Sequence, residues 1–124
     1  MGAIRGYRDL VVWREAMDLV VEVYRLSERL PDRERCGLTS QVQRAMVSVP
    51  ANIAEGHGRS GTREYLHHLS VARGSLLEVE THLQIAVRLN YLPDDDVAPL
   101  LERTALLDRR LRALIARLRE RAAN

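Results

Sequence analysis

The sequence predicts an all-α protein, an up-down-up-down antiparallel four-helix bundle. Apolar residues recur at spacings of three and four, and turn-forming residues divide this pattern into four segments. With 7 Gly and 4 Pro in 124 residues, a sandwich of short strands joined by many turns is not expected. A hydrophobic fraction of 46% excludes a wholly disordered chain, and the lack of Phe predicts an aliphatic core. We expect residues 1–124 to form a single domain.

The first helix is predicted over residues 9–30, with Asp9 as its N-cap and Pro31 just past its end. One apolar row consists of Val12, Ala16, Leu19, Val23, Leu26 and Leu30, and a second of Leu10, Trp13, Met17, Val20 and Tyr24. At 100° per residue the two rows cover about 200°, whereas a surface helix in a monomer needs little more than about 100°. We therefore expect Trp13, Met17, Val20 and Tyr24 to bury a face against another subunit.

The second helix is predicted over residues 38–55. Its inward positions are Leu38, Val42, Ala45, Met46, Val49 and Ile53. Pro50 lies inside this pattern, where it removes one backbone donor and crowds the carbonyl of Met46. Because the apolar spacing continues to Ile53, we expect a kink at Pro50 and not a helix end. Gly56 and Gly58 are suited to end the helix.

The third and fourth helices are predicted over residues 62–89 and 94–121. The stripe of the third helix is Tyr65, Leu69, Ala72, Leu76, Val79, Leu83 and Ala86. The stripe of the fourth is Leu100, Thr104, Leu107, Leu111, Leu114 and Leu118. Alternating steps of four and three favour bundle packing, and short connections make successive helices antiparallel neighbours. Asp94, Asp95 and Asp96 are suited to begin the fourth helix, because carboxylates complement the positive end of its dipole.

A polar stripe runs beside the apolar one on the second helix and on the third. The members are Ser48, Asn52 and Glu55 on the second helix and Ser75, Glu78 and His82 on the third. If the stripes meet, their side chains form a partly buried hydrogen-bond network that sets the helix register. Glu55, Glu78 and His82 could also hold a metal. The repeated Glu-x-x-His pairs of di-iron bundles are missing, so we expect no metal and no cofactor.

No motif in the chain indicates catalysis. Cys36 has no His at a motif spacing, and the glycines at positions 56, 58 and 61 do not form a phosphate-binding loop. We therefore expect no catalytic residues and a protein that is not an enzyme. There is no apolar run near 18 residues and no signal-peptide pattern, so a soluble, cytoplasmic protein without a membrane partner is expected.

Basic residues are unusual in kind and in distribution. All 19 are Arg, the net charge is +2, and six Arg face two acids from Asp108 to the end. Arg suits phosphate contacts, for which the candidates are Arg110, Arg117 and Arg121, joined by Arg59 and Arg63 near the second turn. Two other readings stay open: charges at heptad spacing usually pair across helices, and a GC-rich genome favours Arg codons.

Four segments resemble the 23S rRNA intervening-sequence protein family: LVVWREA at 10–16, GLTSQ at 37–41, SVPANIAEG at 48–56 and ARGSLLE at 72–78. The resemblance extends from Tyr7 to about Leu118 and implies a four-helix bundle that assembles as a homopentamer. Some members are encoded within insertions of bacterial large-subunit rRNA genes. The fold is also similar to the accessory variability proteins of diversity-generating retroelements, which are pentameric, basic, and bind nucleic acid and a reverse transcriptase. The near-neutral charge of this chain departs from theirs.

The leading hypothesis is a non-enzymatic, homo-oligomeric bundle that binds RNA or a ribonucleoprotein through Arg-rich surfaces. The alternative is an oligomeric protein–protein interaction scaffold that does not bind nucleic acid itself. Its partner would be another protein, such as one that processes nucleic acid.

Overall fold

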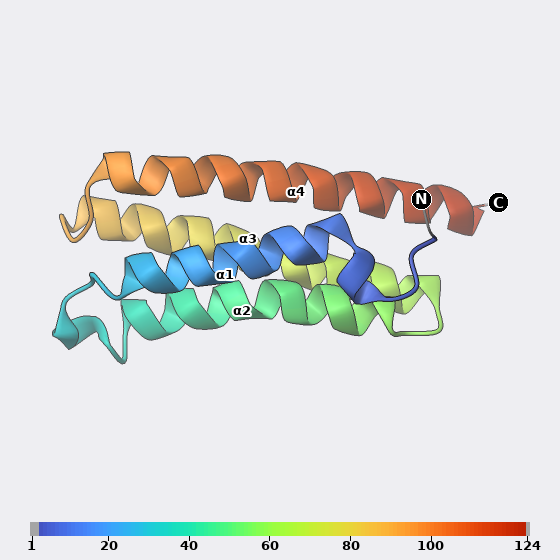
Figure 1. The fold of residues 1–124 in the computed structure, drawn as a ribbon, viewed down its shortest axis with the longest axis horizontal. Helices are drawn as coiled ribbons and strands as arrows, with labels where there is room; N and C mark the ends of the chain where they lie inside the picture. Colours follow the sequence, from blue (N-terminus) through green and yellow to red (C-terminus); the bar gives the residue numbers. More distant parts are fainter. Residues whose placement is uncertain (1–2, 124) are drawn as a thin grey trace.

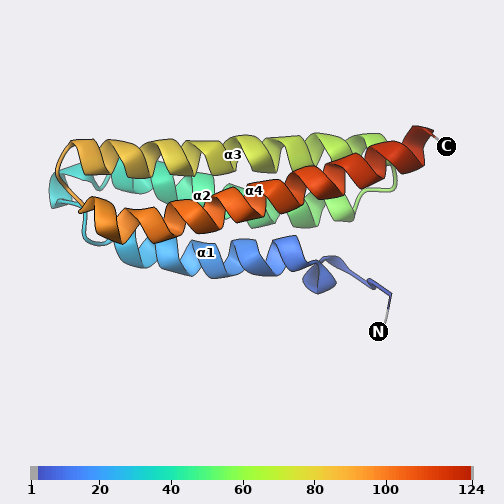
Figure 2. The ribbon, with the colours of Figure 1, turned by 90° about the horizontal axis from the view of Figure 1, so that it is seen from above.

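The computed structural model describes residues 3–123 and confirms a four-helix bundle (Figure 1). The helices are α1 (Val11–Ser27), α2 (Leu38–His57), α3 (Thr62–Arg88) and α4 (Asp94–Ala123), with short 3-10 turns η1 (Tyr7–Asp9) and η2 (Asp32–Glu34). Each helix runs antiparallel to the next, and each packs against the two helices beside it. Figure 2 shows α4 crossing above the others, with its C-terminal end extending beyond the start of α1.

The core is aliphatic, as predicted. Every predicted inward position of α2 is buried, and on α3 only Tyr65 of the predicted stripe stays half-buried. On α4 the predicted stripe is buried as far as Leu111, but Leu114 and Leu118 are half-buried and Ile115 turns inward. The change falls where α4 passes beyond the start of α1, because fewer neighbours cover this part of the helix (Figure 2).

The predicted start and end of the first helix are wrong. Asp9 belongs to η1 and is not the N-cap of α1; its carboxylate accepts the backbone N–H of Arg5 at 3.0 Å. Leu10 occupies the cap position and makes no side-chain cap bond. The helix ends at Ser27, whose Oγ donates to the carbonyl of Tyr24 at 2.9 Å and accepts Nε2 of Gln43 at 2.9 Å.

The second helix continues through Pro50 to His57, two residues past its predicted end. Gly58 is its C-cap, but Gly56 lies within the helix and is buried. A Cβ atom on Gly56 would lie 2.7 Å from Cβ of His68 on α3. Gly56 therefore allows α2 and α3 to approach closely, which is a different role from ending the helix. The expected kink at Pro50 stays a prediction.

The turn from α3 to α4 reverses the chain through one residue in the left-handed region. Asn90 has φ 62°, a conformation that Asn tolerates better than most residues. The N–H of Tyr91 then donates to the carbonyl of Ala86 at 2.9 Å, which ties off the end of α3.

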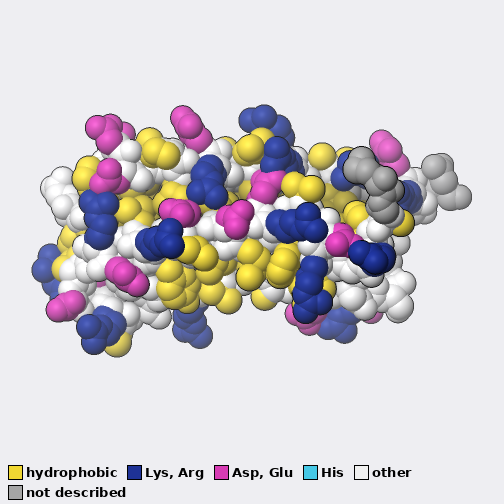
Figure 3. Space-filling view, in the orientation of Figure 1, with side chains coloured by type: hydrophobic (Ala, Val, Ile, Leu, Met, Phe, Trp, Pro, Cys, Tyr) yellow, Lys and Arg dark blue, Asp and Glu magenta, His cyan; other side chains and the backbone are white. Residues whose placement is uncertain are grey.

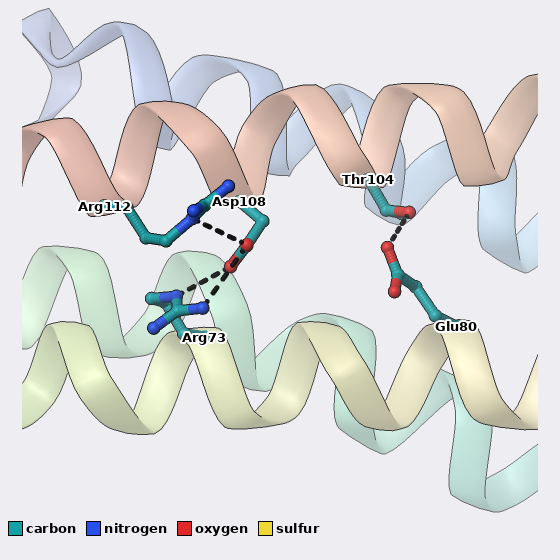
Figure 4. A network of polar contacts seen from close by, with 5 residues as sticks. All are labelled: Arg73, Glu80, Thr104, Asp108 and Arg112. Carbon is teal, nitrogen blue, oxygen red and sulfur yellow. Dashed lines mark hydrogen bonds and ion pairs between the residues drawn. The ribbon is translucent and has the colours of Figure 1, made fainter.

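Polar contacts join α3 to α4 at two places (Figure 4). Arg73 donates to both carboxylate oxygens of Asp108, at 2.7 and 3.3 Å, and Arg112 approaches the same carboxylate at 3.2 Å. Nearer the turn, Oγ1 of the fully buried Thr104 donates to Glu80 at 2.6 Å. A paired, half-buried carboxylate tolerates little sliding, so these contacts fix how α4 lies along α3.

Glu34 links the start of α2 to the turn between α3 and α4. One carboxylate oxygen accepts the backbone N–H of Leu38 at 3.0 Å, and the other accepts the hydroxyl of Tyr91 at 2.9 Å. Gly37 leaves room for this carboxylate, because a Cβ there would lie 2.8 Å from Oε1. The bond from Leu38 and then the bond from Tyr91 hold the pKa of Glu34 below its ordinary value of 4.5.

Glu34→Gln is expected to lower the melting temperature at neutral pH and to have less effect in acid. Because the folded protein favours the ionised carboxylate, this stabilisation is complete above about pH 4.5 and is lost as pH falls through the lower folded pKa. Circular dichroism melts from pH 7 to pH 3 measure it, with the exposed Glu102→Gln as the control. A melting-temperature difference that stays constant over this range would contradict the prediction.

Candidate functional site

Part of the predicted polar network lies between α2 and α3. The Oγ atoms of Ser48 and Ser75 are 2.9 Å apart, and Nδ2 of Asn52 donates to Oγ of Ser48 at 3.0 Å and to its carbonyl at 2.9 Å. Oδ1 of Asn52 faces Nδ1 of His68 at 3.0 Å. Because a carbonyl oxygen only accepts, this ring nitrogen carries the proton. We call Ser48, Asn52, His68 and Ser75 the polar seam.

Sequence reasoning missed His68, although a signal was present. His68, Ser75 and His82 are seven residues apart, so they share one stripe of α3. His68 lies on the buried side of the consecutive pair with His67, which is exposed.

The other three predicted members lie outside the seam, contrary to the expectation. Glu55 is exposed and pairs with Arg59 of the following turn at 2.6 Å. Glu78 is also exposed. His82 is half-buried, and its Nδ1 is buried without a hydrogen-bond partner among the described residues.

Residues 3–123 contain no group of three or more His, Cys, Asp or Glu side chains placed to hold a metal ion. Cys36 is exposed on the loop before α2. None of the four described helices combines the length and the apolar character that crossing a membrane requires.

A cleft of about 500 Å³ lies where the end of α2, the start of α3 and the end of α4 meet. Figure 1 places the α2–α3 turn and the C-terminus at this same end of the bundle. The cleft is lined by Ile4, Leu10, His57, Tyr65, Leu114, Arg117, Leu118 and Arg121. We call it the basic-end cleft. The cleft therefore combines a largely apolar lining with the guanidinium groups of Arg117 and Arg121.

The structure brings four of the five candidate phosphate-contacting arginines to this end. Arg117 and Arg121 line the cleft, and neither forms an ion pair within residues 3–123. Arg63 is exposed in the first turn of α3. Arg59 lies in the turn before it, exposed and paired with Glu55.

Arg110 lies elsewhere. Its guanidinium pairs with Glu15 of α1, so it joins α4 to α1 within the bundle. This is the pairing across helices that heptad-spaced charges usually make. Arg110 is therefore removed from the candidate phosphate surface.

The outer row of α1 forms a second candidate surface. Met17, Val21 and Tyr24 are 42%, 47% and 37% exposed, while Trp13 and Val20 are half-buried. We call these five residues the α1 apolar surface. Figure 3 shows hydrophobic side chains gathered on this face of the molecule, over α1 and α2. Exposed apolar residues in one row leave a helix face that nothing among residues 3–123 covers.

Replacing a member of the polar seam is expected to destabilise the fold. Asn52→Ala leaves Nδ1 of His68 without its partner and removes one of the two contacts of the Ser48 hydroxyl, which should cost about 1–2 kcal/mol. Urea unfolding followed by circular dichroism measures the loss, and Ser70→Ala at an exposed position of α3 is the control. Equal unfolding free energies for both variants would contradict a stabilising role for the seam.

Comparison with known proteins agrees with this architecture. A crystal structure of a protein of unknown function from the S23 ribosomal protein family of Bacteroides thetaiotaomicron superposes with a TM-score of 0.79. At 20% sequence identity, the match covers 85% of this chain and 98% of that one. No curated protein matches the sequence. The family model described as 23S rRNA-intervening sequence protein matches residues 8–113. The chain thus belongs to the 23S rRNA-intervening sequence protein family.

Proposed function

We propose that this protein is a non-enzymatic, self-associating helical bundle that binds RNA phosphates at its basic end. The observation that carries the proposal is that Arg117 and Arg121 line one cleft, while Arg59 and Arg63, from a distant part of the chain, lie by the α2–α3 turn at the same end of the bundle. Arg binds phosphate well because its planar fork donates two parallel hydrogen bonds. The rRNA association in the family's name supports RNA as the ligand.

The helix dipole acts in opposite directions on two of these arginines, Arg121 and Arg63. Arg in the last turn of a helix is stabilised by the negative end of the helix dipole, which accounts for Arg121 on α4. Arg63 lies in the first turn of α3, where the dipole disfavours a positive charge. A basic residue at this unfavourable position supports a role in binding an anion.

Self-association is the second part of the proposal, and the α1 apolar surface is the contact. Its exposed row is the kind of surface that another copy of the chain would bury. The family resemblance implies five copies. A ring would present several basic ends to one RNA, and linked sites raise the overall affinity of a weakly charged subunit.

A protein–protein scaffold is the second candidate function. The net charge of +2 and the use of Arg73 and Arg110 inside the bundle favour it, because both reduce the charge available for phosphate. In that case the α1 apolar surface or the basic-end cleft would bind another protein, such as one that processes nucleic acid.

Arg117→Gln with Arg121→Gln is expected to weaken RNA binding and its dependence on salt. Each lost phosphate contact should reduce the slope of log K against log salt by about 0.7 for a single strand. Fluorescence anisotropy of a labelled rRNA fragment at several salt concentrations measures both quantities. The matched control replaces Arg103 and Arg109, two exposed arginines earlier on α4. Unchanged affinity and slope in the first variant would remove the basic end as the RNA site.

Met17→Glu is expected to shift the protein toward smaller assemblies. A charge placed in an apolar contact is buried without a partner, which opposes association. Light scattering after size exclusion measures the molar mass, and Leu77→Glu provides a matched control at an exposed apolar position of α3. An unchanged molar mass for Met17→Glu would exclude the α1 apolar surface as the contact.

A further inference from the structure

We infer that the basic-end cleft accepts an unpaired RNA base, so that the protein prefers single-stranded or looped RNA to duplex. The inference rests on the proposed function and specifies which RNA that site would take. Phosphate binding alone requires only exposed charge and would be served by a flat surface. This site instead combines a hollow of about 500 Å³ with an apolar lining and two guanidinium groups.

The two chemistries of the cleft match the two parts of a nucleotide. Leu114 and Leu118 of α4, together with Leu10, supply apolar contacts for the faces of a base. Arg117 and Arg121 lie one turn apart on the same helix, so they can bind the adjoining phosphate. The volume lies within the roughly 300–1,000 Å³ that small-molecule sites occupy.

The aromatic wall of the cleft is held in place before any ligand binds. The rings of His57 and Tyr65 meet edge to face, 5.7 Å apart and at 88°. Gly56 lies against Tyr65, because a Cβ on Gly56 would be 3.1 Å from Cδ1 of the Tyr65 ring. Burial also raises the pKa of Tyr65. A fixed, uncharged ring costs little entropy when a base stacks on it.

A base within a duplex cannot enter this cleft, because both of its faces are already stacked. Sequence-bearing contacts to RNA usually involve loops and single strands, whose bases can be turned outward. A duplex of equal length carries twice as many phosphates, so charge alone would make it the tighter ligand. Tighter binding of the single strand would therefore indicate base insertion, whereas tighter binding of the duplex would indicate phosphate binding alone.

The test compares a labelled, unstructured 12-nucleotide RNA with a 12-base-pair duplex by anisotropy, using the full chain. We expect the single strand to bind more tightly. Leu118→Ser should weaken its binding by about tenfold through the lost apolar contact with the base, and should leave duplex binding unchanged. Leu106→Ser, on the same helix and 36% exposed, is the matched control and should change neither.

Two further measurements test base insertion even if Leu118→Ser destabilises the fold. Ile4→Ser alters a residue at the cleft that is 56% exposed and outside every helix, so it should weaken single-strand binding without changing the melting temperature. A 2-aminopurine placed in the single strand reports directly on stacking, and its emission should change on binding.

Duplex binding as tight as single-strand binding, with Leu118→Ser and Ile4→Ser silent, would overturn base insertion. If the Arg117 and Arg121 double variant still lost affinity, phosphate binding at the basic end would stand. Binding of neither RNA at low salt would overturn the proposed function and this inference together.

Discussion

The close approach of α2 and α3 is the constraint on which the rest of the structure depends. The hydroxyl oxygens of Ser48 and Ser75 lie 2.9 Å apart, and a Cβ atom on Gly56 would clash with Cβ of His68. Short side chains at these positions let the two backbones come together, and a hydrogen-bonded seam with few partners permits one register. That register determines where the α2–α3 turn, with Arg59, lies relative to the rest of the bundle.

The position of α4 follows from contacts of a second kind. Asp108 of α4 forms an ion pair with Arg73 of α3, and Arg110 of α4 forms one with Glu15 of α1. These charged pairs therefore fix the position of α4 relative to its two neighbours. Such pairs add little stability where they are exposed, but they discriminate between registers that an aliphatic core would accept almost equally. The cleft exists because both sets of contacts place the end of α4 beside the start of α3. Its shape therefore depends on residues that do not line it.

Sequence patterns were sufficient for the four helices and most of the core, because burial of an apolar stripe depends on helical period alone. They failed where the outcome depends on what lies across the interface. Asp9 is a residue type that often caps helices, but it lies in the 3-10 turn η1, and Leu10 occupies the N-cap position of α1. Glu55 shares a stripe with Ser48 and Asn52, but its side chain is exposed and pairs with Arg59. The cleft combines three distant segments, and no local spacing records that combination.

The position of the single tryptophan has a spectroscopic consequence. Trp13 lies outside the fully buried core, half-buried on α1, with its ring edge to face against Tyr7 at 5.2 Å. Its emission is therefore sensitive to whatever covers α1. If the chain self-associates through the α1 apolar surface, as we propose, dilution should open the indole to an aqueous quencher while the far-ultraviolet signal of the helices stays constant. For the proposed assembly, Trp13 is thus an intrinsic optical probe that would distinguish separation of subunits from unfolding.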